Sequence, residues 1–197
     1  RDHGSSSSYA PAKSRMDIAV WLAQNGAESI QLASDLMIDT LIKGRTIFFC
    51  GNGGSAADSQ HLAAELVCKY KQIRKPLKAI ALTTDTSSLT AIANDFSFDD
   101  IFSRQLEALG QKEDLLYAIS TSGMSKNIIK AIKFAKENKI KIVGLTGEND
   151  SEMSKFCDAL IKVPAKSPDR IQEMHIAVGQ ILCEIIENKL CSDPQLF

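Results

Sequence analysis

Short apolar runs alternate with amphipathic stretches along most of this chain. Each run is four or five residues long and is bounded by polar residues or glycine, as buried β-strands are. The runs lie at 46–50, 79–82, 115–119, 141–145 and 159–163. Elsewhere apolar residues recur every three or four positions, which predicts helices. These stretches are 16–42 with a break at 25–26, 56–70, a short one ending near 94–95, 100–109, 126–138 and 169–189.

The alternation of strands and helices predicts an α/β fold with a doubly wound, five-stranded parallel sheet and helices on both of its faces. The strands show no polar alternation, which is typical of strands covered on both sides. In such sheets, ligands bind in the crevice beyond the carboxyl ends of the strands. The loops after Cys50 and Ile119 follow strands and are therefore the first candidates for a site.

The length of 197 residues fits one domain, which we place at 16–197. Residues 1–15 break the helical pattern with a run of four serines at 5–8 and with Pro11. We interpret this segment as a disordered arm or a cloning remnant and leave it out of the fold argument.

Composition narrows the classes of function. The net charge is −1 and no segment is dominated by lysine and arginine, which argues against nucleic acid as the main ligand. No apolar run is long enough to span a bilayer, and the N-terminus lacks the apolar segment of a signal peptide. The five cysteines are odd in number and show no C-x-x-C spacing, so we expect free thiols in a reducing compartment, the cytoplasm.

The first candidate loop, Gly51–Ser55, joins a predicted strand to a helix. Its backbone N–H groups and hydroxyl lie at a helix N-terminus, where anions bind. The spacing is not G-x-G-x-x-G, and no Lys-Ser/Thr pair follows as in a Walker A loop, so no nucleotide cofactor is expected. The alternative is that the glycines only make a tight strand-to-helix connection.

His61 and Glu65 lie one turn apart on the helix that follows this loop. An imidazole and a carboxylate on one helix face suit acid/base chemistry, or form two ligands of a zinc site. The alternative is a surface pair that contributes little. Its place one turn beyond a candidate ligand loop favours a function.

The second candidate loop, Ser120-Thr121-Ser122-Gly123-Met124-Ser125, also follows a strand and opens a helix. Several hydroxyls together with free N–H groups suit the oxygens of a phosphate. The alternative is capping of the helix by Ser122 or Ser125. Because capping needs only one hydroxyl, the cluster favours anion binding.

The head of the last predicted helix carries a third group of polar residues. Gln172, His175 and Gln180 share one face by helical spacing. We interpret His175 as a histidine that packs between elements of the fold. The two glutamines could be ligands, or polar residues at a subunit contact.

Together these motifs resemble the sugar isomerase (SIS) domain family and, within it, the bacterial phosphoheptose isomerases. The resemblance runs from about residue 30 to 190 and is carried by 50–55, 61–66, 69–70, 91–96, 102–105, 107–110, 119–123 and 170–175. It implies a flavodoxin-like SIS fold, N-terminal helices for oligomerisation, and a homotetramer with active sites between subunits. It also implies interconversion of sedoheptulose-7-phosphate and D-glycero-D-manno-heptose-7-phosphate through an enediol(ate), the first step of heptose synthesis for lipopolysaccharide or capsule.

The resemblance also assigns roles by position. The substrate-binding positions are Asn52, Gly53, Gly54, Ser55, Glu65, Asn94, Asp95, Ser120, Thr121, Ser122, Ser125, Asp169 and Gln172. The zinc ligands would be His61, Glu65 and Gln172, with Gln180 at the fourth ligand position. We assign Glu65 as the base, because isomerisation requires removal of a proton beside a carbonyl group, and the serine loop as the phosphate holder.

Gln180 departs from the family pattern, which has a catalytic histidine eight residues after Gln172. An amide cannot shuttle protons near neutral pH and is a weaker zinc ligand than imidazole. Two hypotheses stay open. One is an isomerase in which Glu65 carries most of the proton transfer. The other is a catalytically weakened SIS protein that binds a sugar phosphate or regulates a partner, like the relative that associates with the DnaA initiator. The presence of Glu65 favours the isomerase.

Overall fold

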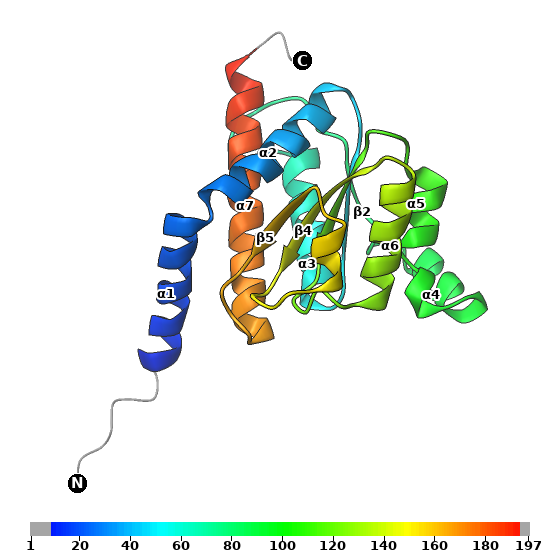
Figure 1. Cartoon of the computed structure of the whole chain (residues 1–197). Coiled ribbons are helices and arrows are strands. Elements are labelled where there is room, and N and C mark those ends of the chain that lie inside the picture. Colours follow the sequence, from blue (N-terminus) through cyan, green and yellow to red (C-terminus); the bar gives the residue numbers. More distant parts are fainter. Residues whose placement is uncertain (1–8, 194–197) are drawn as a thin grey trace.

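The computed structural model describes residues 9–193 and contains one parallel sheet flanked by helices (Figure 1). Its strands are β1 (Ile47–Gly51), β2 (Ala79–Ala81), β3 (Leu115–Ile119), β4 (Lys141–Thr146) and β5 (Ala159–Lys162). They lie in the order β2-β1-β3-β4-β5. This is the flavodoxin-like doubly wound order, so the predicted fold class is confirmed.

The helices follow the predicted stretches with small shifts at their ends. They are α1 (Tyr9–Asn25), α2 (Ala27–Ile42), α3 (Gly54–Val67), α4 (Thr86–Asp95), α5 (Ser103–Leu109), α6 (Lys126–Glu137) and α7 (Pro168–Ser192). Two short 3-10 helices, η1 (Phe98–Asp100) and η2 (Glu152–Lys155), were not predicted as separate elements. Single turns of this kind leave little periodicity in a sequence.

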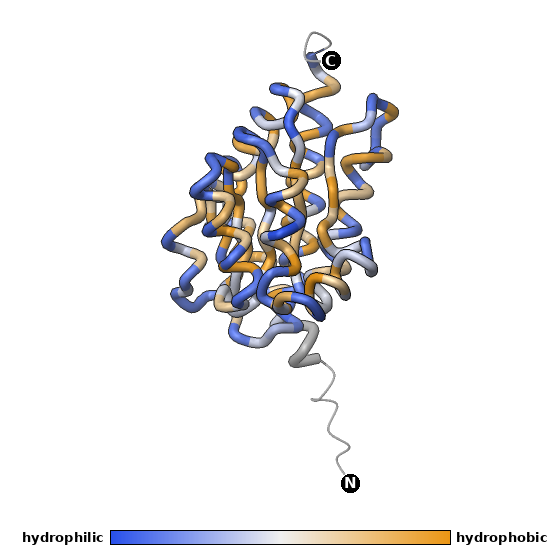
Figure 2. Tube along the Cα trace, turned by 90° about the vertical axis from the view of Figure 1, so that its right-hand side faces the viewer, coloured by the Kyte–Doolittle hydropathy of each residue, from blue (hydrophilic) through white to orange (hydrophobic). Residues whose placement is uncertain are grey.

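Alternate side chains of β3 enter two separate hydrophobic cores. Leu115, Tyr117 and Ile119 pack into the core that α2, α3 and α7 also line. Leu116 and Ala118 point to the opposite core, to which α5 and α6 contribute. Hydrophobic segments gather in the interior, and hydrophilic segments occupy many outer turns (Figure 2). Because both faces of β1 and β3 are buried, these central strands are apolar along their whole length.

The N-terminal helical stretch starts earlier than predicted. α1 begins at Tyr9, so residues 9–15 are helical and do not belong to a disordered arm. Pro11 lies in the first turn of α1, where proline is tolerated because those N–H groups have no intrahelical partner. Residues 1–8 lie outside the described part of the chain. The predicted break is confirmed, since Gly26 separates α1 from α2.

The expectations about cysteine chemistry and membrane spans can be compared with the described residues. All five cysteines are free thiols; Cys50 and Cys183 are buried, whereas Cys68 is exposed. Within 9–193, none of the helices has both the length and the apolar character needed to cross a bilayer.

Two turns at the amino-terminal edge of the sheet hold non-glycine residues in the left-handed backbone region. Glu113 has a φ of 72° and Lys139 a φ of 59°. We expect Lys139→Gly to raise the free energy of unfolding by roughly 0.5–1 kcal/mol, because relief of the strain exceeds the extra entropy that glycine brings to the unfolded chain. Urea denaturation measures this change. Lys112→Gly, in the neighbouring turn at negative φ, is the control, and an unchanged midpoint for Lys139→Gly would contradict the prediction.

Candidate active site

The loop between β1 and α3 lies where the strand order reverses. β1 pairs with β2 on one side and β3 on the other, and Gly51 stands opposite Ile119 in the register. The loops that follow β1 and β3 are therefore neighbours at the carboxyl edge of the sheet, the usual ligand-binding place in this topology. The tight connection also needs its glycines: a Cβ on Gly51 would lie 2.5 Å from the carbonyl oxygen of Ser55, and Gly53 has a φ of 55°.

Two glycines let α7 approach α3 closely. A Cβ on Gly54 would lie 2.6 Å from Oε1 of Gln172, so the amide of Gln172 rests on the first turn of α3. Further along, a Cβ on Gly179 would lie 2.5 Å from Cδ1 of Leu62. The two helices thus run side by side along the site, and α7 delivers Gln172 to the start of α3.

His61 and Glu65 form the predicted pair on α3. Nε2 of His61 lies 3.0 Å from Oε1 of Glu65, and the Glu65 side chain is 20% exposed against 50% for His61. When Nε2 carries the proton, the imidazole donates to the carboxylate and orients it. The end of α3 is held in place because Arg74, in a buried ion pair with Glu187 at 3.0 Å, donates to the carbonyl oxygen of Glu65 at 2.8 Å.

Burial shifts the pKa values of two groups close to this pair. Burial raises the pKa of the Cys183 thiol to about 12, and the nearby carboxylate of Glu65 adds to the rise. Burial also raises the pKa of Asp58 to about 6, while the imidazole of His61 opposes that rise. The thiol beside Glu65 is therefore protonated and unreactive at neutral pH, whereas Asp58, whose raised pKa still lies below 7, is mostly ionised there.

His175 is a packing residue, as predicted. Its side chain is fully buried, and Nε2 lies 3.1 Å from the carbonyl oxygen of Thr146, to which it donates. Burial lowers the pKa of His175 to about 4, and this hydrogen bond opposes the fall only partly. The imidazole is neutral at neutral pH and links α7 to the end of β4.

The hydroxyls of the serine loop, residues 120–125, form hydrogen bonds within the loop itself. Ser120 Oγ accepts the N–H of Gly123 at 3.1 Å and pairs with Ser125 Oγ at 3.1 Å. Ser122 Oγ accepts the N–H of Met124 at 3.2 Å, outside the helix. Ser125 occupies the N-cap position of α6, but its side chain makes no capping bond. Helix capping by these serines is therefore wrong as an explanation of the cluster.

A pair of asparagines joins the two loops. Asn52 Nδ2 donates to Asn127 Oδ1 at 2.9 Å, and Asn127 Nδ2 donates to Asn52 Oδ1 at 2.8 Å. Asn127 is 2% exposed, whereas Asn52 is half-buried. The sequence analysis missed Asn127, because an asparagine in the first turn of a helix carries no signal that it pairs with a residue 75 positions away.

The remaining predicted residues lie around these loops in different environments. Ser55 is buried, with 3% exposure. Asn94 and Asp95 are exposed at the end of α4, where Asn94 Nδ2 donates to Asp95 Oδ1 at 2.8 Å. Asp169 is exposed at the head of α7 and accepts from Ser167 Oγ, a bond that lowers the pKa of its carboxyl. Within the described residues, no hydrogen bond joins Asn94, Asp95 or Asp169 to the two loops.

A hollow of about 140 Å³ opens beside the serine loop. It is lined by Thr121, Ser122, Gly147, Asn149, Ala165, Lys166, Pro168 and Ile171. The Lys166 side chain is 80% exposed, and its ion pair with Glu148 is long, at 3.6 Å. Its ammonium group is therefore largely exposed at the edge of this hollow beside the serine loop, a placement that the sequence alone did not indicate.

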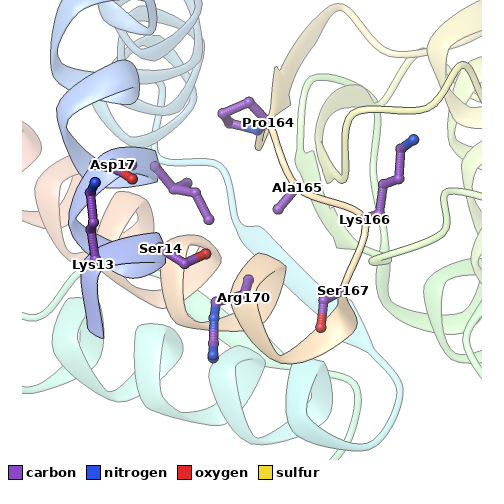
Figure 3. Close-up of a pocket in the computed structure, with 9 residues that line it drawn as sticks. Lys13, Ser14, Asp17, Pro164, Ala165, Lys166, Ser167 and Arg170 are labelled. Carbon is purple, nitrogen blue, oxygen red and sulfur yellow. The ribbon is translucent and has the colours of Figure 1, made fainter. Parts of the chain in front are cut away.

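A second hollow lies between α1 and the segment that leads into α7 (Figure 3). Lys13, Lys166 and Arg170 all line it. In Figure 3 the charged ends of these three side chains point in different directions and do not converge on one place. This hollow therefore does not form an anion site by itself.

Comparison with known proteins identifies the family. The family model described as "SIS domain" matches residues 15–147. The phosphoheptose isomerase of Rhodospirillum rubrum is 51% identical over 166 residues, which cover 84% of this chain and 88% of that protein. The chain belongs to the SIS domain family, among the phosphoheptose isomerases.

Another relative of this SIS protein and two solved structures support the same family assignment. The phosphoheptose isomerase of Campylobacter jejuni is 52% identical over 158 residues, which cover 80% of this chain and 85% of that protein. The solved phosphoheptose isomerase of Neisseria gonorrhoeae superimposes with a TM-score of 0.86 at 40% identity, over 91% of this chain and 96% of that chain. The one from Francisella tularensis gives 0.88 at 33% identity over the same shares.

The donor groups of this SIS protein do not suit a tightly held zinc ion. In the stretch 9–193, no three His, Cys, Asp or Glu side chains gather closely enough to hold a metal. His61 and Glu65 are the only strong donors among the four residues at the family's ligand positions, and Gln172 and Gln180 supply amides. Zinc sites in proteins use histidine, cysteine and carboxylate ligands. The Gln172 amide, moreover, rests on Gly54 at the opposite end of α3 from Glu65.

Proposed function

We propose that this SIS protein isomerises sedoheptulose-7-phosphate to D-glycero-D-manno-heptose-7-phosphate. The single observation that carries the proposal is the Glu65 carboxylate, oriented by His61 at 3.0 Å, on the helix that the first ligand loop opens. A base at the reacting carbons and a cradle for the distant phosphate are what a sugar-phosphate isomerase requires.

The proposed reaction moves one proton between neighbouring carbons. The Glu65 carboxylate removes a proton from the carbon beside the carbonyl group, and the C–H electrons form the double bond of an enediolate while the carbonyl oxygen gains the negative charge. The carboxyl group then returns its proton to the former carbonyl carbon, and a hydroxyl proton passes between the two oxygens. His61 keeps the carboxylate in place. Gln180 cannot take part in the transfer between oxygens, so we expect slow turnover.

The phosphate end would lie in the serine loop. The hydroxyls of Ser120 and Ser125 bond to each other and can still form further hydrogen bonds. The start of α6, where Ser125 makes no side-chain capping bond, adds backbone N–H groups. Lys166 would supply the positive charge that the loop itself lacks, since it lines the adjoining hollow.

Lys166→Met is expected to raise KM for sedoheptulose-7-phosphate roughly fivefold and to leave kcat nearly unchanged, because one exposed charge contact with the phosphate contributes about 1 kcal/mol. Steady-state kinetics at low salt measures this. Lys155→Met, an exposed lysine on η2, is the control. Equal KM values for wild type and Lys166→Met would contradict the role.

An activity assay tests the proposal as a whole. Purified protein is incubated with sedoheptulose-7-phosphate, and the aldose product is followed by a coupled assay or by NMR. Turnover supports the isomerase. Binding of the sugar phosphate without turnover, measured by calorimetry, would instead support the weakened binding or regulatory protein, an alternative that Gln180 favours.

We also propose a homotetramer in the cytoplasm, with active sites between subunits. The support is the exposed apolar surface of α1, where Met16, Val20 and Trp21 are 66%, 54% and 43% exposed. Burial of such side chains against other copies is favourable. For zinc, we propose partial occupancy at His61 and Glu65, because the amides of Gln172 and Gln180 are weak ligands.

A further inference from the structure

We propose that Asn127 is a positioning residue for the sugar: it sets the orientation of the Asn52 amide, so that Asn52 presents one donor and one acceptor to two different substrate hydroxyls. This inference rests on the proposed function, since it needs a sugar phosphate in the crevice between the two loops. It concerns a residue that lies too deep to touch the substrate itself.

The backbone determines which way the Asn127 amide faces. Asn127 Oδ1 accepts the N–H of Ile128 at 2.9 Å, in the first turn of α6. If the amide were turned over, its NH2 group would face this N–H, and two donors would meet in a buried place. Such an arrangement loses the bond and leaves buried groups unpaired. The oxygen of Asn127 is therefore held on the side of Ile128.

The orientation of Asn127 in turn determines that of Asn52. The two amides exchange reciprocal hydrogen bonds of 2.9 and 2.8 Å. Turning only Asn52 over would bring oxygen to oxygen and nitrogen to nitrogen, and both bonds would be lost. The backbone N–H of Ile128 thus determines the orientation of the Asn127 amide, and Asn127 in turn determines that of Asn52 in the other loop.

The hydrogen-bonding groups of Asn52 that Asn127 does not use suit two sugar hydroxyls. An amide offers two N–H donors and two acceptor lone pairs, and Asn127 uses one of each. Among the described residues, the Asn52 side chain forms no hydrogen bond other than those with Asn127. Asn52 is half-buried and so partly accessible, whereas Asn127 is buried. In such a reciprocal pair the unused N–H and the unused lone pair point outward at opposite edges of the Asn52 amide, so one sugar hydroxyl can accept from Asn52 and another can donate to it.

The geometry also separates the sugar end from the phosphate end. Asn52 precedes α3, which carries His61 and Glu65, whereas Asn127 is the second residue of α6, the helix that follows the serine loop. Loss of the amide pair should therefore disturb recognition of the sugar but leave the hydroxyls of Ser120 and Ser125 in their mutual bond at 3.1 Å.

A kinetic double-mutant cycle tests the inference. Asn127→Leu keeps the branched shape and the number of side-chain heavy atoms and removes both bonds to Asn52, and we expect kcat/KM for sedoheptulose-7-phosphate to fall about 10–100-fold. Asn52→Ala should cause a similar loss. If Asn127 acts through Asn52, the double variant should be no worse than Asn52→Ala alone, because neighbouring residues in one network are not additive. The inhibition constant of inorganic phosphate should stay within about twofold of wild type.

Asn138→Leu, at the other end of α6, is the matched control and should behave as wild type. Asn127→Asp keeps the acceptor for Ile128 and Asn52, so it should lose less activity than Asn127→Leu. It also provides a second variant if Asn127→Leu does not fold.

Additive losses in the double variant, or weaker phosphate inhibition in Asn127→Leu, would overturn the inference and indicate general damage to α6. Wild-type kinetics in Asn127→Leu would overturn it as well. These outcomes differ from failure of the proposed function, in which the wild type neither converts nor binds sedoheptulose-7-phosphate; that result would overturn both.

Discussion

Glu65→Gln is expected to abolish turnover of sedoheptulose-7-phosphate, with kcat reduced about 1000-fold or more, while the sugar phosphate still binds. The amide has the size of the carboxylate but cannot accept a proton, so the transfer between carbons loses its base. The glutamine side chain also keeps an oxygen that can accept from His61, whose Nε2 lies 3.0 Å from Oε1 of Glu65 in the native protein. The fold should therefore stay intact.

The measurement is steady-state kinetics together with calorimetric binding of the substrate. Glu107→Gln, an exposed glutamate on α5, makes the same chemical change away from the crevice and should retain full activity. If Glu65→Gln kept more than about a tenth of the wild-type rate, another group would be the base. If it lost binding as well, Glu65 would act in recognition and not in proton transfer.

Gln180→His is expected to have the second large effect on turnover and, unlike Glu65→Gln, to raise it. We expect kcat to rise about 100-fold, because general acid/base groups typically contribute at least that much and an imidazole can pass a proton between the substrate oxygens. Gln180 is half-buried on α7, directly after Gly179 at the contact with Leu62. A histidine there stands beside α3, which carries His61 and Glu65.

Kinetics and metal analysis of the same samples check this prediction. The zinc content should rise from a substoichiometric value toward one per subunit, since imidazole is a better zinc ligand than an amide. Gln31→His, an exposed glutamine on α2, controls for the added histidine. Full and tight zinc in the wild type, or an unchanged rate in Gln180→His, would show that this position does not limit catalysis.

The fold could be predicted from the sequence because both faces of the central strands are buried. That burial requires continuous apolar strands, and the runs at 46–50, 115–119 and 141–145 match β1, β3 and β4 closely. The start of α1 was predicted less well. Four serines and Pro11 conceal a helix that begins at Tyr9, because a proline in the first turn is indistinguishable in sequence from one that ends a helix.

The candidate site could be predicted only where its residues are close in the chain. His61 and Glu65 are one helical turn apart, so their contact follows from helix geometry alone. The serine loop was recognisable for the same reason. This reasoning could not find Asn127, Lys166 or the close contact of Gln172 with Gly54, because each depends on segments that are far apart in sequence.

The sequence by itself determined the α/β class, the two loops, the His61–Glu65 pair and the departure at Gln180, because local periodicity and short motifs encode them. Only the tertiary structure decided that α7 lies against α3 through Gly54 and Gly179, and that Asn52 is oriented by Asn127. Glycine permits such contacts without specifying the partner, and a reciprocal amide bond depends on the angle between two side chains. Both become definite only when the sheet brings the loops after β1 and β3 together.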